Sequence, residues 1–125
     1  MVVFDTDVLI DAMNGKRKAL DIIGRHQGEK AALTIFNKYE LLNGRRFVSR
    51  PAIEEFVNDM IVYDAGTKEI EAASDIYLRL SEAGQMIDEL DILIAGVVLA
   101  NGEKLVTFDR HFKSIKDQSI IVLDG

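Results

Sequence analysis

The sequence predicts an α/β fold in three layers, with a mainly parallel central sheet of about five strands flanked by helices. Short apolar runs rich in β-branched residues alternate along the chain with longer segments of helical periodicity, and this alternation is typical of a parallel sheet covered on both faces. The length of 125 residues fits one domain. Apolar residues make up 48% of the chain and only one residue is proline, which excludes a disordered or collagen-like protein. We therefore expect one domain over residues 1–125.

The first elements are a strand, two helices and a second strand. The run Val2-Val3-Phe4 is fully apolar, as in a strand buried on both faces. Apolar residues over 8–12 predict a short helix, which Asn14-Gly15 ends by turn chemistry. We expect a second helix over 17–25 and a second strand over 31–33.

The middle of the chain predicts two helices and a third strand. Thr34 can cap a helix whose apolar face continues to Gly44. Pro51 suits the first turn of the next helix, in which apolar residues repeat at helical spacing as far as Met60. The segment 60–63 then predicts a strand.

The last part predicts two long helices and two strands. Gly66-Thr67 begins the longest helix, and Gly84 ends it. The helix over 88–100 is apolar on nearly all sides after its first turn, so we expect it in the core. Strands over 105–107 and 120–123 complete the sheet.

Composition excludes several classes of protein. The chain has no cysteine, which excludes disulfides, thiolate zinc sites and cysteine nucleophiles and fits a reducing cytoplasm. The longest apolar run, residues 92–100, is far shorter than the ~20 residues of a membrane span. We expect a cytoplasmic protein with no membrane contact.

Charge is distributed unevenly, although the net charge is −6. Residues 14–50 contain nine Lys and Arg and three acids, whereas the rest of the chain contains six bases and 18 acids. A solvated helix surface explains the basic stretch as well as a polyanion-binding surface does.

Five acids are predicted to meet at one edge of the sheet. Asp5 and Asp109 directly follow expected strands, and Asp91 lies in the first turn of the buried helix. Asp88 precedes Asp91 by three residues, and Glu40 lies on the helix after the second strand. In open α/β sheets, ligands bind beyond the carboxyl ends of the strands, so we expect the carboxylates to face one cleft.

Carboxylates that share a cleft raise one another's pKa unless a cation neutralises them. Mg²⁺ and Mn²⁺ prefer such oxygen ligands. Thr6 and Thr107 would border the cleft and can hydrogen-bond a carboxylate or phosphate. Each residue also has a purely structural explanation, because acids favour strand-end turns and first helical turns, Asp109 can cap the turn 109–111, and threonine favours strands.

Four segments of the chain form a distinctive set: VFDTDVLID (3–11), YELLNG (39–44), DILIAG (91–96) and LVTFDRHF (105–112). In sequence, order and spacing they resemble the PIN-domain ribonucleases, and among them the small VapC-type toxins of prokaryotic toxin–antitoxin pairs. Two positions depart from the family pattern, because Asp7 stands where serine or asparagine is common and Phe108 where arginine or asparagine is common.

The resemblance implies a PIN-like fold and a metal-dependent endoribonuclease. The family's acids match Asp5, Glu40, Asp91 and Asp109, which would surround one or two Mg²⁺ or Mn²⁺ ions, and Asp88 matches an additional acidic position. The resemblance also implies a homodimer and a cognate antitoxin that occupies the groove. Basic residues would then hold the RNA backbone, the candidates being Lys16, Arg17, Lys18, Arg25, Arg45, Arg46 and Arg50.

Three other functions remain open at this point. A phosphoacceptor receiver domain would use Asp64, but the chain lacks adjacent acids after the first strand. A haloacid-dehalogenase-like phosphatase would use Asp5 as nucleophile, but such a fold is usually longer. A catalytically silent PIN scaffold would bind partners and leave the acids unused.

Overall fold

The computed structural model describes residues 1–44 and 48–124 and contains one five-stranded sheet in these residues. All neighbouring strands are parallel, in the order β3-β2-β1-β4-β5. The strands are β1 (Val2–Phe4), β2 (Ala31–Thr34), β3 (Ile61–Tyr63), β4 (Lys104–Thr107) and β5 (Ile120–Val122). The predicted parallel sheet is confirmed.

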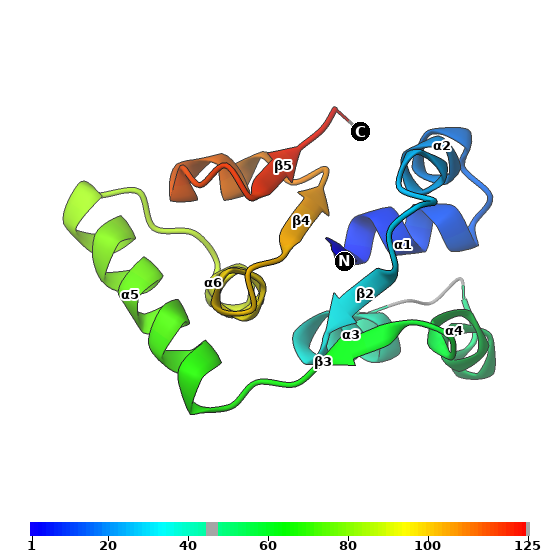
Figure 1. Cartoon of the computed structure of the whole chain (residues 1–125), viewed down its shortest axis with the longest axis horizontal. Coiled ribbons are helices and arrows are strands. Elements are labelled where there is room, and N and C mark those ends of the chain that lie inside the picture. The colour runs from blue at the N-terminus through cyan, green and yellow to red at the C-terminus, as the bar shows by residue number, and fades with distance from the viewer. Residues whose placement is uncertain (45–47, 125) are drawn as a thin grey trace.

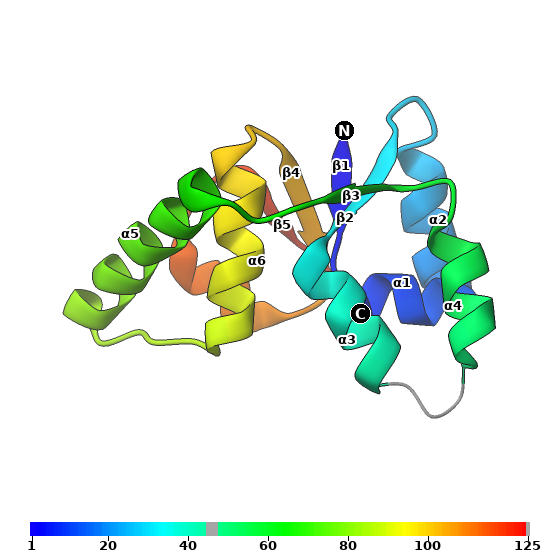
Figure 2. The ribbon, with the colours of Figure 1, turned by 90° about the horizontal axis from the view of Figure 1, so that it is seen from below.

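Helices cover both faces of the sheet, as Figures 1 and 2 show. On one side lie α1 (Thr6–Met13), α2 (Arg17–Arg25) and α4 (Arg50–Val57), and on the other lie α5 (Thr67–Ala83) and α6 (Glu89–Ala100). A further helix, α3 (Ile35–Gly44), lies below the strands in Figure 2. The predicted three-layer α/β fold is therefore confirmed.

Alternate side chains of the central strands pack in two separate hydrophobic cores. In β1, Val2 and Phe4 pack in the core under α1, α2 and α4, whereas Val3 packs in the core under α5 and α6. All three side chains are buried. Because side chains in a strand point alternately to opposite faces, β1 contributes to both cores. The apolar run at the N-terminus is thus explained by a strand between two helical layers.

The nearly apolar α6 is buried as predicted and packs closely against α5. A Cβ atom at Gly96 would lie 2.6 Å from Cβ of Ala73. Such a distance is far below van der Waals contact, so only glycine permits this separation of the two helices. Gly84 ends α5 in the left-handed conformation, with φ of 66°, as the sequence predicts.

Three predicted boundaries change in the structure. The first helix begins at Thr6, directly after β1, and not near residue 8. The helix that begins at Arg50 ends at Val57, and Met60 lies in the turn before β3, where its N–H donates to the carbonyl of Val57 (3.0 Å). A short 3₁₀ helix, η1 (Arg110–Ile115), follows β4 where only a turn was expected, because six residues are too few for a helical pattern to stand out.

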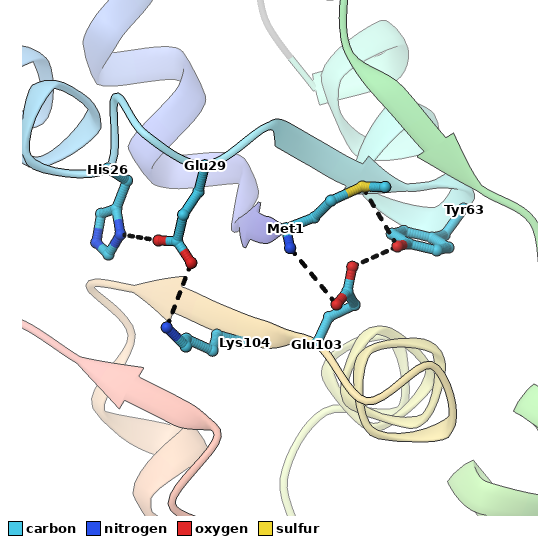
Figure 3. Close-up of polar contacts among 6 residues, drawn as sticks. All are labelled: Met1, His26, Glu29, Tyr63, Glu103 and Lys104. Atoms are coloured by element: carbon cyan, nitrogen blue, oxygen red, sulfur yellow. Dashed lines mark hydrogen bonds and ion pairs between the residues drawn. The ribbon is translucent and has the colours of Figure 1, made fainter.

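Polar contacts link the starts of β1 and β4 to the segment before β2 and to Tyr63 at the end of β3 (Figure 3). Glu29 accepts hydrogen bonds from Nδ1 of His26 (2.8 Å) and Nζ of Lys104 (3.3 Å). Glu103 accepts a short hydrogen bond from the hydroxyl of Tyr63, which helps to raise the pKa of Tyr63 to about 12. Each of these carboxylates has a donor facing it.

Within residues 1–44 and 48–124, no helix combines the length and apolar character needed to cross a membrane.

Candidate active site

The carboxylate of Asp5 is buried where β1 ends and α1 begins. The Asp5 side chain does not cap α1, and its backbone N–H donates to the carbonyl of Val106 in β4 (2.9 Å). Its two carboxylate oxygens accept hydrogen bonds from Oγ1 of Thr107 (2.7 Å) and Nδ2 of Asn37 (3.2 Å). Asp5 is only 5% exposed, so strands β1 and β4 and helix α3 together fix this carboxylate.

Helix α3 contributes a polar side chain that the sequence did not single out. Asn37 is fully buried, and its Oδ1 accepts from both N and Oγ1 of Thr34 (2.9 Å each). Its Nδ2 donates to Asp5 and to Oγ1 of Thr6 (3.1 Å). The Thr6 hydroxyl then donates to Oε1 of Glu40 (2.6 Å), one turn along α3 from Asn37. A continuous hydrogen-bond chain therefore joins two acids through α3.

The predicted cap of this helix is confirmed, because Oγ1 of Thr34 accepts from the N–H of Asn37 (3.1 Å). A signal for Asn37 was present in the sequence. A polar residue three positions after the cap and three before Glu40 falls on the same inward face of the helix, where an apolar residue would otherwise be expected.

Asp109 follows β4 by two residues and is linked to Asp5 through Thr107. Its N–H donates to Oγ1 of Thr107 (3.0 Å), whose hydroxyl in turn donates to Asp5. One oxygen of Asp109 accepts from the N–H of His111 (2.9 Å) and caps η1. The capping considered from the sequence is thus observed, and it holds Asp109 at the edge of the site. His111 itself is largely exposed, with 76% of its side chain accessible.

The first turn of α6 brings Asp91 to the same edge. Burial and the negative charges of four other acids, Asp5, Asp109, Asp88 and Glu40, together raise the pKa of Asp91 to about 7. The four other acids that the sequence assigned to the cleft therefore all act on Asp91 in the structure.

Burial also raises the pKa of Asp5, to about 6. Hydrogen bonds from Thr107 and from the backbone N–H of Thr6 stabilise the charged form and oppose this rise, whereas the charges of Asp7 and Glu40 add to it. Burial outweighs the two hydrogen bonds. Without a bound cation, ionisation of Asp5 is therefore less favourable in the folded protein than in water.

These residues match the chemistry of a hard divalent cation. The site offers carboxylate and hydroxyl oxygens, and a cation would neutralise the mutual repulsion of its acids. In the described part of the chain, however, no three His, Asp or Glu side chains are already grouped as a metal-binding set. The donor chemistry fits an ion, and part of its coordination shell would have to come from other oxygens.

The basic residues expected to hold RNA lie outside this acidic site or form salt bridges with acids. Lys16, at the start of α2, pairs with Asp11 (3.6 Å), and Arg50, at the start of α4, pairs with Glu54 (3.6 Å). Arg17 is exposed in the first turn of α2. Arg45 and Arg46 lie outside the described residues.

The sheet order argues against a receiver domain. The strand before Asp64 is β3, which pairs only with β2 at one edge of the sheet. Asp64 is exposed there, and two strand positions separate it from β1 and its buried Asp5. No phosphoacceptor cluster around Asp64 is formed.

The PIN domain family model matches residues 2–118, and the chain belongs to the PIN domain family. No curated protein matches the sequence significantly. Among solved structures, it is similar to a chain of DNA-bound VapBC from Salmonella typhimurium, with 24% identity, a TM-score of 0.80 and coverage of 98% of this chain and 96% of the other. A chain of VapBC2 from Rickettsia felis, bound to a DNA fragment from its promoter, has 19% identity, a TM-score of 0.82 and coverage of 100% and 99%.

A third similar structure is VapBC-5 from Mycobacterium tuberculosis, described as a member of the VapBC family of toxin–antitoxin systems. It has 22% identity, a TM-score of 0.73 and coverage of 98% of this chain and 97% of the other. At these identities the similarity establishes a shared fold over almost the full length of each chain.

Proposed function

We propose that this protein is a Mg²⁺- or Mn²⁺-dependent endoribonuclease and the toxin of a VapC-type toxin–antitoxin pair. One observation carries the proposal: four other acids, Asp5, Glu40, Asp88 and Asp109, raise the pKa of the half-buried Asp91 in addition to its burial. A bound divalent metal ion would supply positive charge to these acids and to a phosphodiester substrate. Membership of the PIN domain family supports the same conclusion.

Asp5 and Asp91 would provide the main ligands, with Glu40, Asp109 and Asp88 around them. A bound Mg²⁺ or Mn²⁺ ion lowers the pKa of a coordinated water and stabilises charge on the scissile phosphate. Water and substrate oxygens usually complete the coordination of Mg²⁺, which suits a site with few preformed ligands.

The hydrogen-bonded neighbours would orient these acids. Thr107 and Asn37 hold the two oxygens of Asp5, and Thr6 holds one oxygen of Glu40. Residues of this kind fix the direction in which a ligand presents its lone pairs, and their loss typically weakens metal binding about 10–100-fold.

RNA that presents accessible phosphates and unstacked bases, such as a single-stranded loop, is the expected substrate. One similar structure is described as a toxin–antitoxin complex from Klebsiella pneumoniae, and VapBC-5 is described as a member of a family of toxin–antitoxin systems. We therefore also propose a cognate antitoxin as partner and, by resemblance to the family, a homodimer that acts in the cytoplasm. Light scattering at micromolar concentration tests the dimer, and a monomer would contradict it.

The decisive experiment incubates the purified protein with mixed RNAs, with Mg²⁺, with Mn²⁺ or with EDTA, and maps the ends of the products. We expect cleavage only with the metals. Asp91→Asn should abolish it, whereas the matched control Asp75→Asn, on the exposed face of α5, should cleave like the wild type. Equal cleavage by Asp91→Asn would contradict the proposal, and binding without cleavage by the wild type would favour a silent scaffold.

A further inference from the structure

The 3₁₀ helix η1 carries a row of cations that begins beside the acidic site. In a 3₁₀ helix, side chains three positions apart lie one above the other. Phe112 and Ile115 form the buried row of η1, whereas Arg110 and Lys113 form an exposed row. The exposed C-cap residue Lys116 follows just beyond the helix and lines the same hollow as Lys113, so we count it with this row. The pattern thus separates an apolar face, which anchors η1 to the core, from a cationic face in solvent.

The position of the row follows from the acid that caps the helix. Asp109 caps η1 and Arg110 is its first residue, so the row starts at the acidic site and extends away from it. With a rise of ~2 Å per residue, Arg110 and Lys113 are ~6 Å apart along the axis of η1. This spacing is comparable with the separation of successive phosphates along an extended single strand.

The surface on either side of the row is hollowed and carries a further cation. Arg79 of α5 lines one hollow together with Ser114 and Lys116. Lys113 and Lys116 line a second hollow on the side of β5. A chain that followed the row would therefore lie between two concave surfaces.

The cations of the row are not neutralised within the protein. Among the described residues, no salt bridge involves Arg110, Lys113 or Lys116, in contrast to the carboxylate partners of Lys16 and Arg50. The backbone conformation at the C-cap of η1 does not explain why that residue is a lysine either. Lys116 has φ of 57° in the left-handed region, which glycine or asparagine adopts more easily.

We propose that Arg110, Lys113 and Lys116 bind consecutive phosphates of an RNA strand whose scissile phosphate lies at the acidic site. This inference rests on the proposed nuclease function. An acidic cleft repels a polyanion, and a chain of net charge −6 offers little general attraction, so an adjacent row of unpaired cations provides the local field that binding requires. The same row places the strand in register with the acids, because phosphate contacts fix the position of a nucleic acid without reading its sequence.

The test compares two double variants that each remove two positive charges. Lys113→Gln with Lys116→Asn removes the distal part of the row and keeps a residue that tolerates the left-handed backbone. Lys30→Gln with Lys104→Gln removes two exposed lysines at the opposite edge of the sheet, so both proteins have the same net charge. Binding of a fluorescein-labelled single-stranded RNA of mixed sequence is followed by anisotropy over a range of salt concentrations, with Ca²⁺ in place of Mg²⁺ to prevent turnover.

We expect the row variant to bind every RNA more weakly and its log–log salt slope to fall by about 1.4, or ~0.7 for each lost single-strand contact. The control should keep the wild-type slope, and both variants should keep the wild-type Mn²⁺ affinity in titration calorimetry without RNA. Equal affinity and slope in the two variants would overturn the inference and leave the nuclease proposal standing. A row variant that binds RNA normally but loses an acidic antitoxin peptide would assign the row to protein binding instead. A wild type that binds no RNA would overturn both proposals.

Discussion

The two edges of the sheet use the same acidic side chains in opposite ways. At the amino edge, His26 and Lys104 donate to Glu29 and lower its pKa (Figure 3). At the carboxyl edge, Asp5 and Asp91 are surrounded by other acids and have pKa values raised to about 6 and about 7. A protein that needed its acids only for structure would neutralise both edges. Under the proposed function, a cation from outside the chain would complete the carboxyl edge.

The largest expected difference between the edges is in catalysis. Asp5→Asn preserves the volume of the side chain but removes a ligand charge, so we expect metal-dependent RNA cleavage to fall at least ~100-fold. Glu29→Gln, the matched change at the amino edge, should leave the rate unchanged. Single-turnover cleavage rates measure the effect of each variant. Similar rates in Asp5→Asn and Glu29→Gln would contradict the assignment of catalysis to the carboxyl edge.

The next effect concerns the support of the carboxyl edge by α3. Asn37→Ala leaves Asp5, Thr6 and Thr34 without their buried partner, which should cost about 1–3 kcal/mol in the free energy of unfolding. It should also raise the Mg²⁺ concentration required for half-maximal cleavage about 10–100-fold. Asn43→Ala, an exposed change on the same helix, is the control. A loss of stability with no change in metal requirement would limit Asn37 to a structural role.

The edges also predict how stability depends on pH. Because the pKa values of Asp5 and Asp91 lie above the ordinary 3.8, the folded state binds more protons than the unfolded state between about pH 4 and 7, and stability must fall as the pH rises through this range. From pH 5 to pH 8 we expect a loss of about 2 kcal/mol in metal-free buffer, with allowance for solvent around the half-buried Asp91.

Urea unfolding at the two pH values measures this loss. Asp91→Asn should reduce the loss and make the metal-free protein more stable at pH 8. The lowered pKa of Glu29 acts in the opposite direction only near and below its ordinary value of 4.5, and therefore does not mask the change. Greater wild-type stability at pH 8 than at pH 5 would contradict the electrostatic description of the carboxyl edge.

The smallest effect is expected at the amino edge. Lys104→Gln removes one exposed partner of Glu29, and exposed ion pairs contribute little and are screened by salt. The melting temperature should fall by at most a few degrees in low salt and by less in high salt. A large, salt-independent fall would show that this edge is more tightly coupled to the core than its exposure indicates.

The sequence predicted the strands and long helices well because their apolar patterns depend on local spacing. The run Val2–Phe4 and the apolar part of α6 after its first turn are buried as expected. The acids at the strand ends were also identifiable, since a parallel sheet collects such positions at one edge. Their mutual effect on pKa was expected as well, but not its size at each acid, because the size depends on burial and on distances between segments that are far apart in the sequence.

Short and polar features escaped prediction for different reasons. The helix η1 has only six residues, so its three-residue period repeats too few times to distinguish it from a turn. Asn37 was missed because its partners come from β1, α1 and β2, and only the packing of α3 brings them within hydrogen-bond distance. For the same reason the sequence did not distinguish the unpaired cations of η1 from Lys16 and Arg50, which have carboxylate partners.

The most direct test of the central claim is the melting temperature of the metal-free protein at pH 8 as Mn²⁺ is added. A cation that binds the folded carboxyl edge stabilises it by mass action, by about 2.7 kcal/mol at 100 times the dissociation constant. We expect a saturable rise in the wild type and in Glu29→Gln, and little or no rise in Asp91→Asn. A flat titration of the wild type, or an equal rise in Asp91→Asn, would contradict the account of the carboxyl edge as a divalent-cation site.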